Sequence, residues 1–192
     1  WDSNKIIGFA LVSIALLVVV IGYFYTPYDP NAMSVTLKNK APSWSHWFGT
    51  DYMGRDILSR VMDGAGTTFF VGAATVCIGA VFGSVIGAIT GYFGGVFDEI
   101  IMRINDCVAS FPSILLALVF VSLIGTGKYN IILALGILFI PSFARVMRSE
   151  FMKQKEMDYV KNAKLMGASH ARIMFLHILP NTRTILTSSI TI

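Results

Sequence analysis

Residues 79–91 read GAVFGSVIGAITG, an apolar segment in which glycine returns at every fourth position. A glycine inside a helix costs up to about 1 kcal/mol relative to alanine, so four on one face need a compensating gain. Small residues four apart supply that gain in membranes, because they let two helix backbones approach closely. The stretch predicts a membrane helix that packs tightly on another helix through Gly79, Gly83, Gly87 and Gly91.

The composition of the whole chain agrees with a membrane location. Its 192 residues are 55% hydrophobic and 14% charged, whereas soluble domains carry roughly 25% charged residues. Charge-free windows mark the candidate spans, because about 20 apolar residues cross the hydrocarbon core as a helix. The fold class predicted is therefore all-α integral membrane. The windows cover residues 6–28, 64–97, 107–127 and 129–144, a fifth starts at 184, and Pro141 predicts a kink or boundary near the end of the fourth.

Three regions follow from these windows. Residues 1–28 predict an N-terminal transmembrane helix that is retained, because no small-residue cleavage pattern of a signal peptide follows it. Residues 29–66 form an extracellular or periplasmic segment, and residues 67–192 form a transmembrane domain. The first residue is Trp rather than Met, so we expect the chain to be a piece of a longer one.

The distribution of charge predicts the orientation. Residues 145–172 contain seven basic and three acidic residues, and the positive-inside rule places such a stretch in the cytoplasm. Counting the spans back from there puts residues 29–63 outside and the N-terminus, with Lys5, inside. Residues 29–63 hold equal numbers of basic and acidic side chains, as expected of an exported loop.

Charged residues also lie beside the third window. Glu99 and Arg103 are four residues apart, and Arg103 and Asp106 three, so these side chains can pair along one helical face. A proton relay is the alternative for ionisable groups within a membrane. We favour the ion pairs, because the three residues lie at the edge of the membrane rather than at its centre.

Residues 158–181, DYVKNAKLMGASHARIMFLHILPN, form a polar and basic interruption. Residues 150–166 predict one amphipathic helix that ends at Gly167; Ser169 can cap a second short helix, which Pro180 closes. Such a hairpin suits either a docking surface for a soluble protein or an interfacial helix on acidic lipid, and periodicity leaves both open. The apolar stripe consists of Phe151 or Met152, then Tyr159, Val160, Ala163 and Met166.

The hairpin resembles the EAA loop of the permease subunits of binding-protein-dependent ABC importers. That loop has the pattern E-A-A, three residues, Gly, nine residues, then I-x-L-P. The positions in register are Ala163, Gly167, Leu179 and Pro180. The departures are Lys161 for Glu, Asn162 for the first Ala and His177 for Ile. The missing Glu leaves the charge pairing with a partner open.

A second stretch, HWFGTDYMGRDILSRVMDGA over residues 46–65, resembles the segment before the second helix in C-type subunits of dipeptide, oligopeptide and nickel importers. Three of its side chains could suggest a metal site, but in a Gly-rich loop they are more often turn and capping residues. GYFGG, FPS and PSFARVMRSE also match that subfamily in order, so the resemblance covers nearly the whole chain. The signature positions are His46, Gly49, Thr50, Asp51, Gly54, Arg55, Asp56 and Arg60.

The resemblance implies a type I ABC importer transmembrane domain with six helices, of which this chain would end in the fifth. It implies a second homologous permease subunit, two cytoplasmic ABC ATPase subunits and an extracellular or periplasmic solute-binding protein, within the cytoplasmic (inner) membrane of a bacterium or archaeon. ATP and Mg²⁺ would be bound by the ATPases, with no cofactor on this chain. In the implied coupling loop, residues 145–181, the contact positions are Tyr159, Val160, Lys161, Asn162, Ala163, Met166, Gly167, Ala168, Leu179 and Pro180.

Short peptides are the favoured solute, and nickel or a metal chelate stays open. The sequence contains no G-x-x-x-x-G-K-[ST] motif, so we expect a transport subunit rather than an enzyme. A membrane-embedded enzyme would need a nucleophile and base or a metal cluster at membrane depth, where the sequence offers scattered Ser and Thr. An ATP-independent channel or scaffold would explain the helices but not the EAA loop. Nucleic acid is not an expected partner, because no basic patch with interleaved aromatics occurs.

Overall fold

The structure, a computed structural model, describes residues 3–191 of the chain, with side chains for residues 5–190. The chain divides into two compact units, Trp1–Phe70 and Val71–Ile192, and each is described by itself. Throughout the described residues the regular elements are helices, and strand pairing is limited to an isolated bridge between Thr50 and Asp56. The all-α membrane fold class predicted from the sequence is confirmed.

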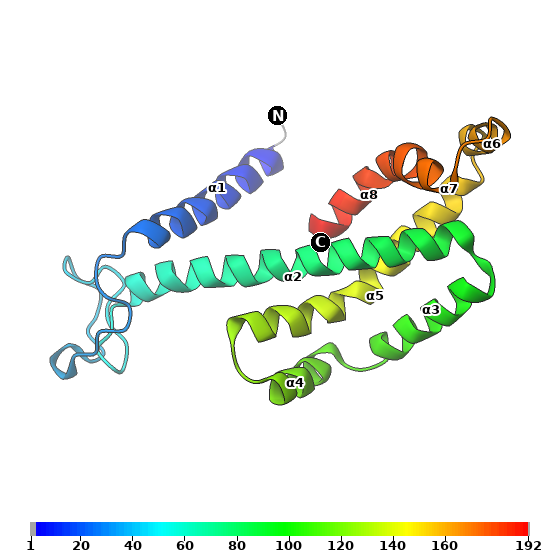
Figure 1. The fold of residues 1–192 in the computed structure, drawn as a ribbon. Coiled ribbons are helices and arrows are strands. Elements are labelled where there is room, and N and C mark those ends of the chain that lie inside the picture. The colour runs from blue at the N-terminus through cyan, green and yellow to red at the C-terminus, as the bar shows by residue number, and fades with distance from the viewer. Residues whose placement is uncertain (1–2, 192) are drawn as a thin grey trace. The chain divides into compact units, whose positions relative to one another are not determined.

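The first unit contains α1 (Ser3–Phe24), a short 3₁₀ helix η1 (Val35–Leu37) and the beginning of α2 (Ile57–Phe93) (Figure 1). α1 exposes apolar side chains all around, as a helix surrounded by lipid does. Its last turn touches α2, because a Cβ added to Gly22 would lie 2.7 Å from the carbonyl oxygen of Met62. This contact sets the ends of the two helices at the same level.

The second unit contains the rest of α2 and six further helical elements. They are α3 (Gly95–Ala109), α4 (Ser113–Ile124), α5 (Lys128–Lys155), α6 (Asp158–Leu165), α7 (His170–Arg172), and α8 (Leu179–Thr191), with a π-helical stretch η2 (Ile173–Ile178) between the last two. Figure 1 shows α6 and α7 at the C-terminal end of α5. The interruption that the sequence predicts between two membrane segments therefore lies at one end of this unit.

The glycine face of α2 lies directly on α5 of the same unit. A Cβ added to Gly79 would lie 2.5 Å from the Cβ of Phe139, and one added to Gly83 would lie 2.6 Å from the Cβ of Phe143. The contact continues along the helix, where an added Cβ would meet the carbonyl oxygen of Ala144 from Gly87 and that of Arg148 from Gly91. Backbone meets backbone over three turns, which larger side chains would prevent.

Among residues 3–191, three helices are long and apolar enough to cross a membrane: Lys5–Phe24, Ile57–Phe93 and Lys128–Lys155. α3 and α4 together count as a fourth span if their 88° bend interrupts a single crossing. The single helix predicted over residues 107–127 is therefore wrong. The break falls at Phe111 and Pro112, because the ring of a proline pushes the preceding residue out of the helical region.

Two predicted boundaries are also wrong. α5 continues through Pro141 to Lys155, so of the two alternatives predicted for Pro141, a kink or a boundary, the boundary is wrong. The last helix begins at Leu179 rather than at 184, and it contains Pro180 in its first turn, where a missing N–H is tolerated. A charge-free window shows which residues can lie in the hydrocarbon core. A helix can extend beyond the ends of such a window, because its backbone hydrogen bonds also form outside the hydrocarbon.

Candidate functional site

The hairpin after α5 is built from two short helices and a turn. α5 ends at Lys155, Met157 is extended, and α6 (Asp158–Leu165) then begins in a new direction. The single helix predicted over residues 150–166 is therefore wrong. The predicted capping by Ser169 is confirmed, because its Oγ accepts a hydrogen bond from the backbone N–H of Arg172 at 3.3 Å. The second helix does not close at Pro180, since η2 leads into α8.

One face of α6 belongs to the core of the second unit. Val160 is fully buried and Ala163 is 7% exposed, and both pack with Phe151 of α5 and with Ile173 and Ile178 of η2. Partly buried residues, Tyr159, Ala168 and Leu179, pack around this core. Ala163 was predicted on the docking stripe; in the structure the returning segment of the hairpin covers the face of α6 that carries it.

The opposite face and the tip of the hairpin are open. Leu165 and Met166 are 86% and 84% exposed, and they directly precede Gly167. Gly167 has φ of +78°, a conformation that side chains with a Cβ rarely adopt, although the space around it is empty. Lys161 and Asn162 are exposed on the same helix. The hairpin thus presents two large apolar side chains beside a turn of fixed geometry.

A hydrogen bond fixes the base of the hairpin to the end of α2. The Tyr92 hydroxyl lies 2.8 Å from Nδ1 of His170, and the two rings meet edge to face. Lys155 donates from Nζ to the carbonyl oxygen of Tyr92 at 3.3 Å, and the ammonium of Lys164 lies over the Tyr92 ring. Sequence reasoning missed this contact, because its partners are 78 residues apart and no local spacing signals it.

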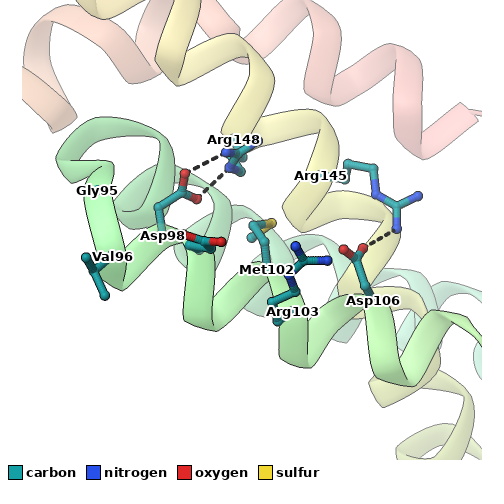
Figure 2. Close-up of a pocket in the computed structure, with 9 residues that line it drawn as sticks. Gly95, Val96, Asp98, Met102, Arg103, Asp106, Arg145 and Arg148 are labelled. Carbon is teal, nitrogen blue, oxygen red and sulfur yellow. Dashed lines mark hydrogen bonds and ion pairs between the residues drawn. The ribbon is translucent and has the colours of Figure 1, made fainter.

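A cleft of about 720 Å³ separates α3 from α5 near the same end (Figure 2). Asp98, 6% exposed, accepts two hydrogen bonds of 2.5 Å from the Nε and Nη2 atoms of Arg148. Farther along the cleft, Nη2 of Arg145 donates to Asp106 at 3.1 Å, and Figure 2 shows both pairs bridging the two helices. α3 therefore turns Asp98 and Asp106 toward α5.

This arrangement corrects the predicted ion pairs. Asp106 pairs with Arg145 of α5 rather than with Arg103 of its own helix. Within the described part of the chain, no ion pair joins Glu99 to Arg103. A guanidinium on a packed neighbouring helix can meet a carboxylate in bidentate geometry, whereas a surface pair within one helix contributes about 0.5 kcal/mol at most.

In the segment between α1 and α2 the carboxylate of Asp56 caps the beginning of α2. It accepts hydrogen bonds of 2.8 Å from the backbone N–H and from the hydroxyl of Ser59, and one of 2.9 Å from Nδ1 of His46. The Ser59 hydroxyl in turn accepts the backbone N–H of Tyr28 at 3.0 Å. This is the capping role that the sequence predicts for Asp56. Between residues 3 and 191 no three metal-ligating side chains cluster.

The other signature residues hold the turns of that segment. Asp51 accepts the backbone N–H groups of Met53 and Arg55 and the Nε of Arg55, and its carboxylate lies 3.9 Å from Nε of Arg60. Thr50 is buried and accepts the backbone N–H of Lys40. The two glycines have positive φ, +75° and +77°, and backbone atoms leave no room for a Cβ on either: Gly49 and Gly54.

Burial alone would raise the pKa of Asp56, but the hydrogen bonds from Ser59 and His46 outweigh it and hold the pKa below the ordinary value of 3.8. A carboxylate with a lowered pKa stabilises the fold at pH above its unfolded value, and that contribution is lost as the pH falls through the folded pKa. We therefore expect the Ser59 amide to resist hydrogen exchange at pH 5 and to lose protection below about pH 3.8.

Asp56→Asn provides the matched control for that measurement. Asn also caps helices but does not titrate. The Ser59 amide should therefore be less protected than in the wild type at pH 5, and its protection, measured relative to an unfolded peptide at the same pH, should change little on acidification. The same loss of protection in both proteins would show that another group is responsible.

The sequence of this chain is similar to those of known transport proteins. The sequence model of the family described as "Binding-protein-dependent transport system inner membrane component" matches residues 83–192. The glutathione transport system permease protein GsiD of Salmonella typhimurium is 46% identical over 176 residues, 91% of this chain and 57% of the relative. The protein of that name from Shigella sonnei is 43% identical over 175 residues, 90% of this chain and 58% of the relative.

The chain thus spans less than three-fifths of the length of these curated relatives. The family match covers the glycine face of α2 from Gly83 onward, both ion pairs of the cleft and the whole hairpin. It agrees with the resemblance drawn from the EAA-like stretch, and the relatives, which match 90% or more of this chain, agree with the resemblance drawn from residues 46–65. The chain belongs to the family of binding-protein-dependent transport system inner membrane components, the permeases that carry the transmembrane fold of type I ABC importers.

Proposed function

We propose that this chain is the membrane-spanning subunit of an ATP-driven importer of short peptides, forming half of the translocation pathway. The observation that carries the proposal is the hairpin: Leu165 and Met166 project from a turn that Gly167 shapes, and the hairpin is held to α2 and α5. A rigid, outward apolar tip suits the groove of a soluble partner. A push on such a tip would reach the membrane helices through the buried core behind it.

The charge pattern supports a cytoplasmic position for the hairpin. Seven basic and three acidic residues lie between 145 and 172, as the positive-inside rule expects of a cytoplasmic stretch, and counting the spans back from it supports a cytoplasmic N-terminus. The partners that follow are two ABC ATPase subunits, which bind ATP and Mg²⁺, a second homologous permease and an exported solute-binding protein. This chain would bind none of the nucleotide itself.

The names of the relatives support a peptide-like solute. Both are named as permeases of glutathione transport systems, and glutathione is a tripeptide. Uptake of labelled glutathione and of labelled dipeptides, in cells with and without this subunit, tests the solute class. Mass spectrometry of the ligand held by the co-purified solute-binding protein identifies the molecule. Uptake of neither peptide class with the intact complex would contradict the proposal.

The tip of the hairpin gives a direct test of coupling. Leu165→Ser and Met166→Ser remove apolar surface that the chain leaves exposed, so the subunit itself should fold and insert normally. Burial of such a side chain in a partner contributes about 1.5–3 kcal/mol, so each change should weaken capture of the ATPase roughly tenfold or more. Pull-down of the ATPase with each variant measures this, and unchanged capture by both would place docking elsewhere.

Ala163→Asp serves as the contrasting variant. Ala163 lies in the core of the hairpin, so the carboxylate would be buried without a partner in this chain itself. We expect a lower amount of folded subunit in the membrane, whereas the two tip variants should leave that amount unchanged. Equal subunit levels with selective loss of the ATPase in Ala163→Asp would mean that this face contacts the partner directly.

A further inference from the structure

The exported segment presents large aromatic side chains from a turn that is held firmly in place. Trp44 is 95% exposed, Trp47 66% and Phe48 54%, and we call residues 44–48 the aromatic turn. His46, in the middle of the turn, is 8% exposed. The inward side chain of His46 fixes the turn, while one exposed ring precedes it and two follow it.

The fixing contacts tie the aromatic turn to the start of α2. Nδ1 of His46 hydrogen-bonds to Asp56, the residue before α2, at 2.9 Å. The carbonyl oxygen of Ser45 accepts the Tyr28 hydroxyl at 2.7 Å, and the backbone N–H of Tyr28 donates to Ser59 in the first turn of α2. The exposure of the rings is therefore a property of an ordered structure and not of a loose loop.

The first span gives the depth of this structure in the membrane. The 20 residues Lys5–Phe24 measure about 30 Å as a helix, the thickness of the hydrocarbon core. Gly22, two residues from the end of that span, touches Met62 of α2. Asp56 precedes Met62 by six residues, about 9 Å along the helix axis or less if the helix is tilted, and Gly22 lies about 3 Å inside the end of the span. Asp56, to which His46 of the turn is hydrogen-bonded, therefore lies about 6 Å beyond the hydrocarbon core. The headgroup layer is about 5–8 Å thick on each side, so the aromatic turn lies at that layer.

We propose that the aromatic turn is seated in the lipid headgroup layer of the exported face, with Trp44, Trp47 and Phe48 as its membrane contacts. Indole and phenyl rings are amphipathic or apolar bodies that partition into this layer, and tryptophan does so most strongly. The turn is continuous with two apolar spans that enter the same bilayer. Interfacial attachment of the turn would hold the α1 end and the α2 cap at one depth, independently of the solute and of the ATPase.

The test uses nitroxide labels on cysteines introduced at positions 44, 47 and 16 in the complete transport complex. The complex is reconstituted in vesicles of phosphatidylethanolamine and phosphatidylglycerol. Accessibility to oxygen, which concentrates in lipid, is compared with accessibility to a water-soluble nickel chelate. Labels at 44 and 47 should report a depth between that of the label at 16, within α1, and that of a label free in water.

Two other outcomes overturn the proposal. Labels as accessible to the nickel chelate as the free label would mean that the rings face water. Labels shielded from both oxygen and nickel, in the complex alone or only after addition of the solute-binding protein, would mean that a protein covers the turn.

A pair of variants tests the attachment itself. With a label at position 48, Trp44→Ser combined with Trp47→Ser should move the label toward water and raise its nickel accessibility severalfold. Val35→Ser is the control, because Val35 is 80% exposed in the same segment but lies on η1. An unchanged depth of the label in the double variant would show that the indoles do not hold the turn in the membrane.

Discussion

Replacement of Gly87 by alanine is expected to lower the free energy of unfolding of the transmembrane unit by about 3 kcal/mol. The added Cβ would meet the carbonyl oxygen of Ala144 and would lie 2.8 Å from the backbone nitrogen of Arg148 and from the Cβ of Met147. These are backbone or near-backbone atoms of α5, which cannot rotate away as the tip of a side chain can. The two helices must separate, and the contacts along the whole glycine face weaken with them.

Gly72→Ala is the matched control on the same helix. A Cβ at Gly72 meets nothing within 4 Å, so only helix propensity changes, and stability should be unchanged or rise by up to about 1 kcal/mol. The two variants are compared by heating the purified proteins in detergent and measuring, by gel filtration, how much monodisperse protein remains at each temperature. Equal midpoints for Gly72→Ala and Gly87→Ala would show that the close contact contributes little.

The membrane class and the close helix contact could both be predicted from local patterns. Hydropathy identifies a span because the hydrocarbon core requires apolar side chains at nearly every position. Such a run of consecutive apolar residues can be recognised directly in the sequence. Glycine at every fourth position identifies a packed face because one helical turn brings those residues into line. That the partner helix is α5 could not be predicted, since any helix offering an accessible backbone would satisfy the pattern.

The breaks in the helices were harder to predict. Pro112 ends a helix while Pro141 lies inside one, although both follow apolar residues. What differs is the surrounding packing, since Pro141 is buried and Pro112 is exposed. The kink at Met157 has no proline or glycine to signal it. It arises because α6 turns so that Val160 and Ala163 can reach the core.

The charged residues illustrate the same limit. Spacing along one helix suggested that Arg103 would pair with Asp106, but the fold brings Arg145 to Asp106 and Arg148 to Asp98. The paired residues are 39 and 50 positions apart in the sequence. They meet because α3 packs against α5, and no periodicity within a single helix predicts such a contact.

Arg148 occupies a special position among these residues because it contacts two other helices. Its backbone lies against the glycine face of α2, where a Cβ on Gly91 would be 2.5 Å from its carbonyl oxygen. Its guanidinium holds Asp98 of α3 in bidentate geometry. Three residues farther along α5, Phe151 enters the core of the hairpin. A displacement of the hairpin would therefore reach α2 and α3 through this part of α5.

Asp98→Asn is expected to destabilise the transmembrane unit by about 3 kcal/mol. Removal of one partner of a buried ion pair leaves the other charge uncompensated and costs roughly 3–5 kcal/mol, and the 31% exposure of the Arg148 side chain places the effect at the lower limit.

Asp106→Asn is the internal control: Asp106 and Arg145 are 56% and 63% exposed, and such pairs contribute about 1 kcal/mol or less. Thermal inactivation of both variants, with Arg148→Gln and the double variant Asp98→Asn with Arg148→Gln, completes a cycle that isolates the pair. The double variant should be more stable than the sum of the two single effects predicts, because no lone charge remains buried. If the two single effects simply add, or if Asp106→Asn costs as much as Asp98→Asn, the pair does not join α3 to α5 as its geometry indicates.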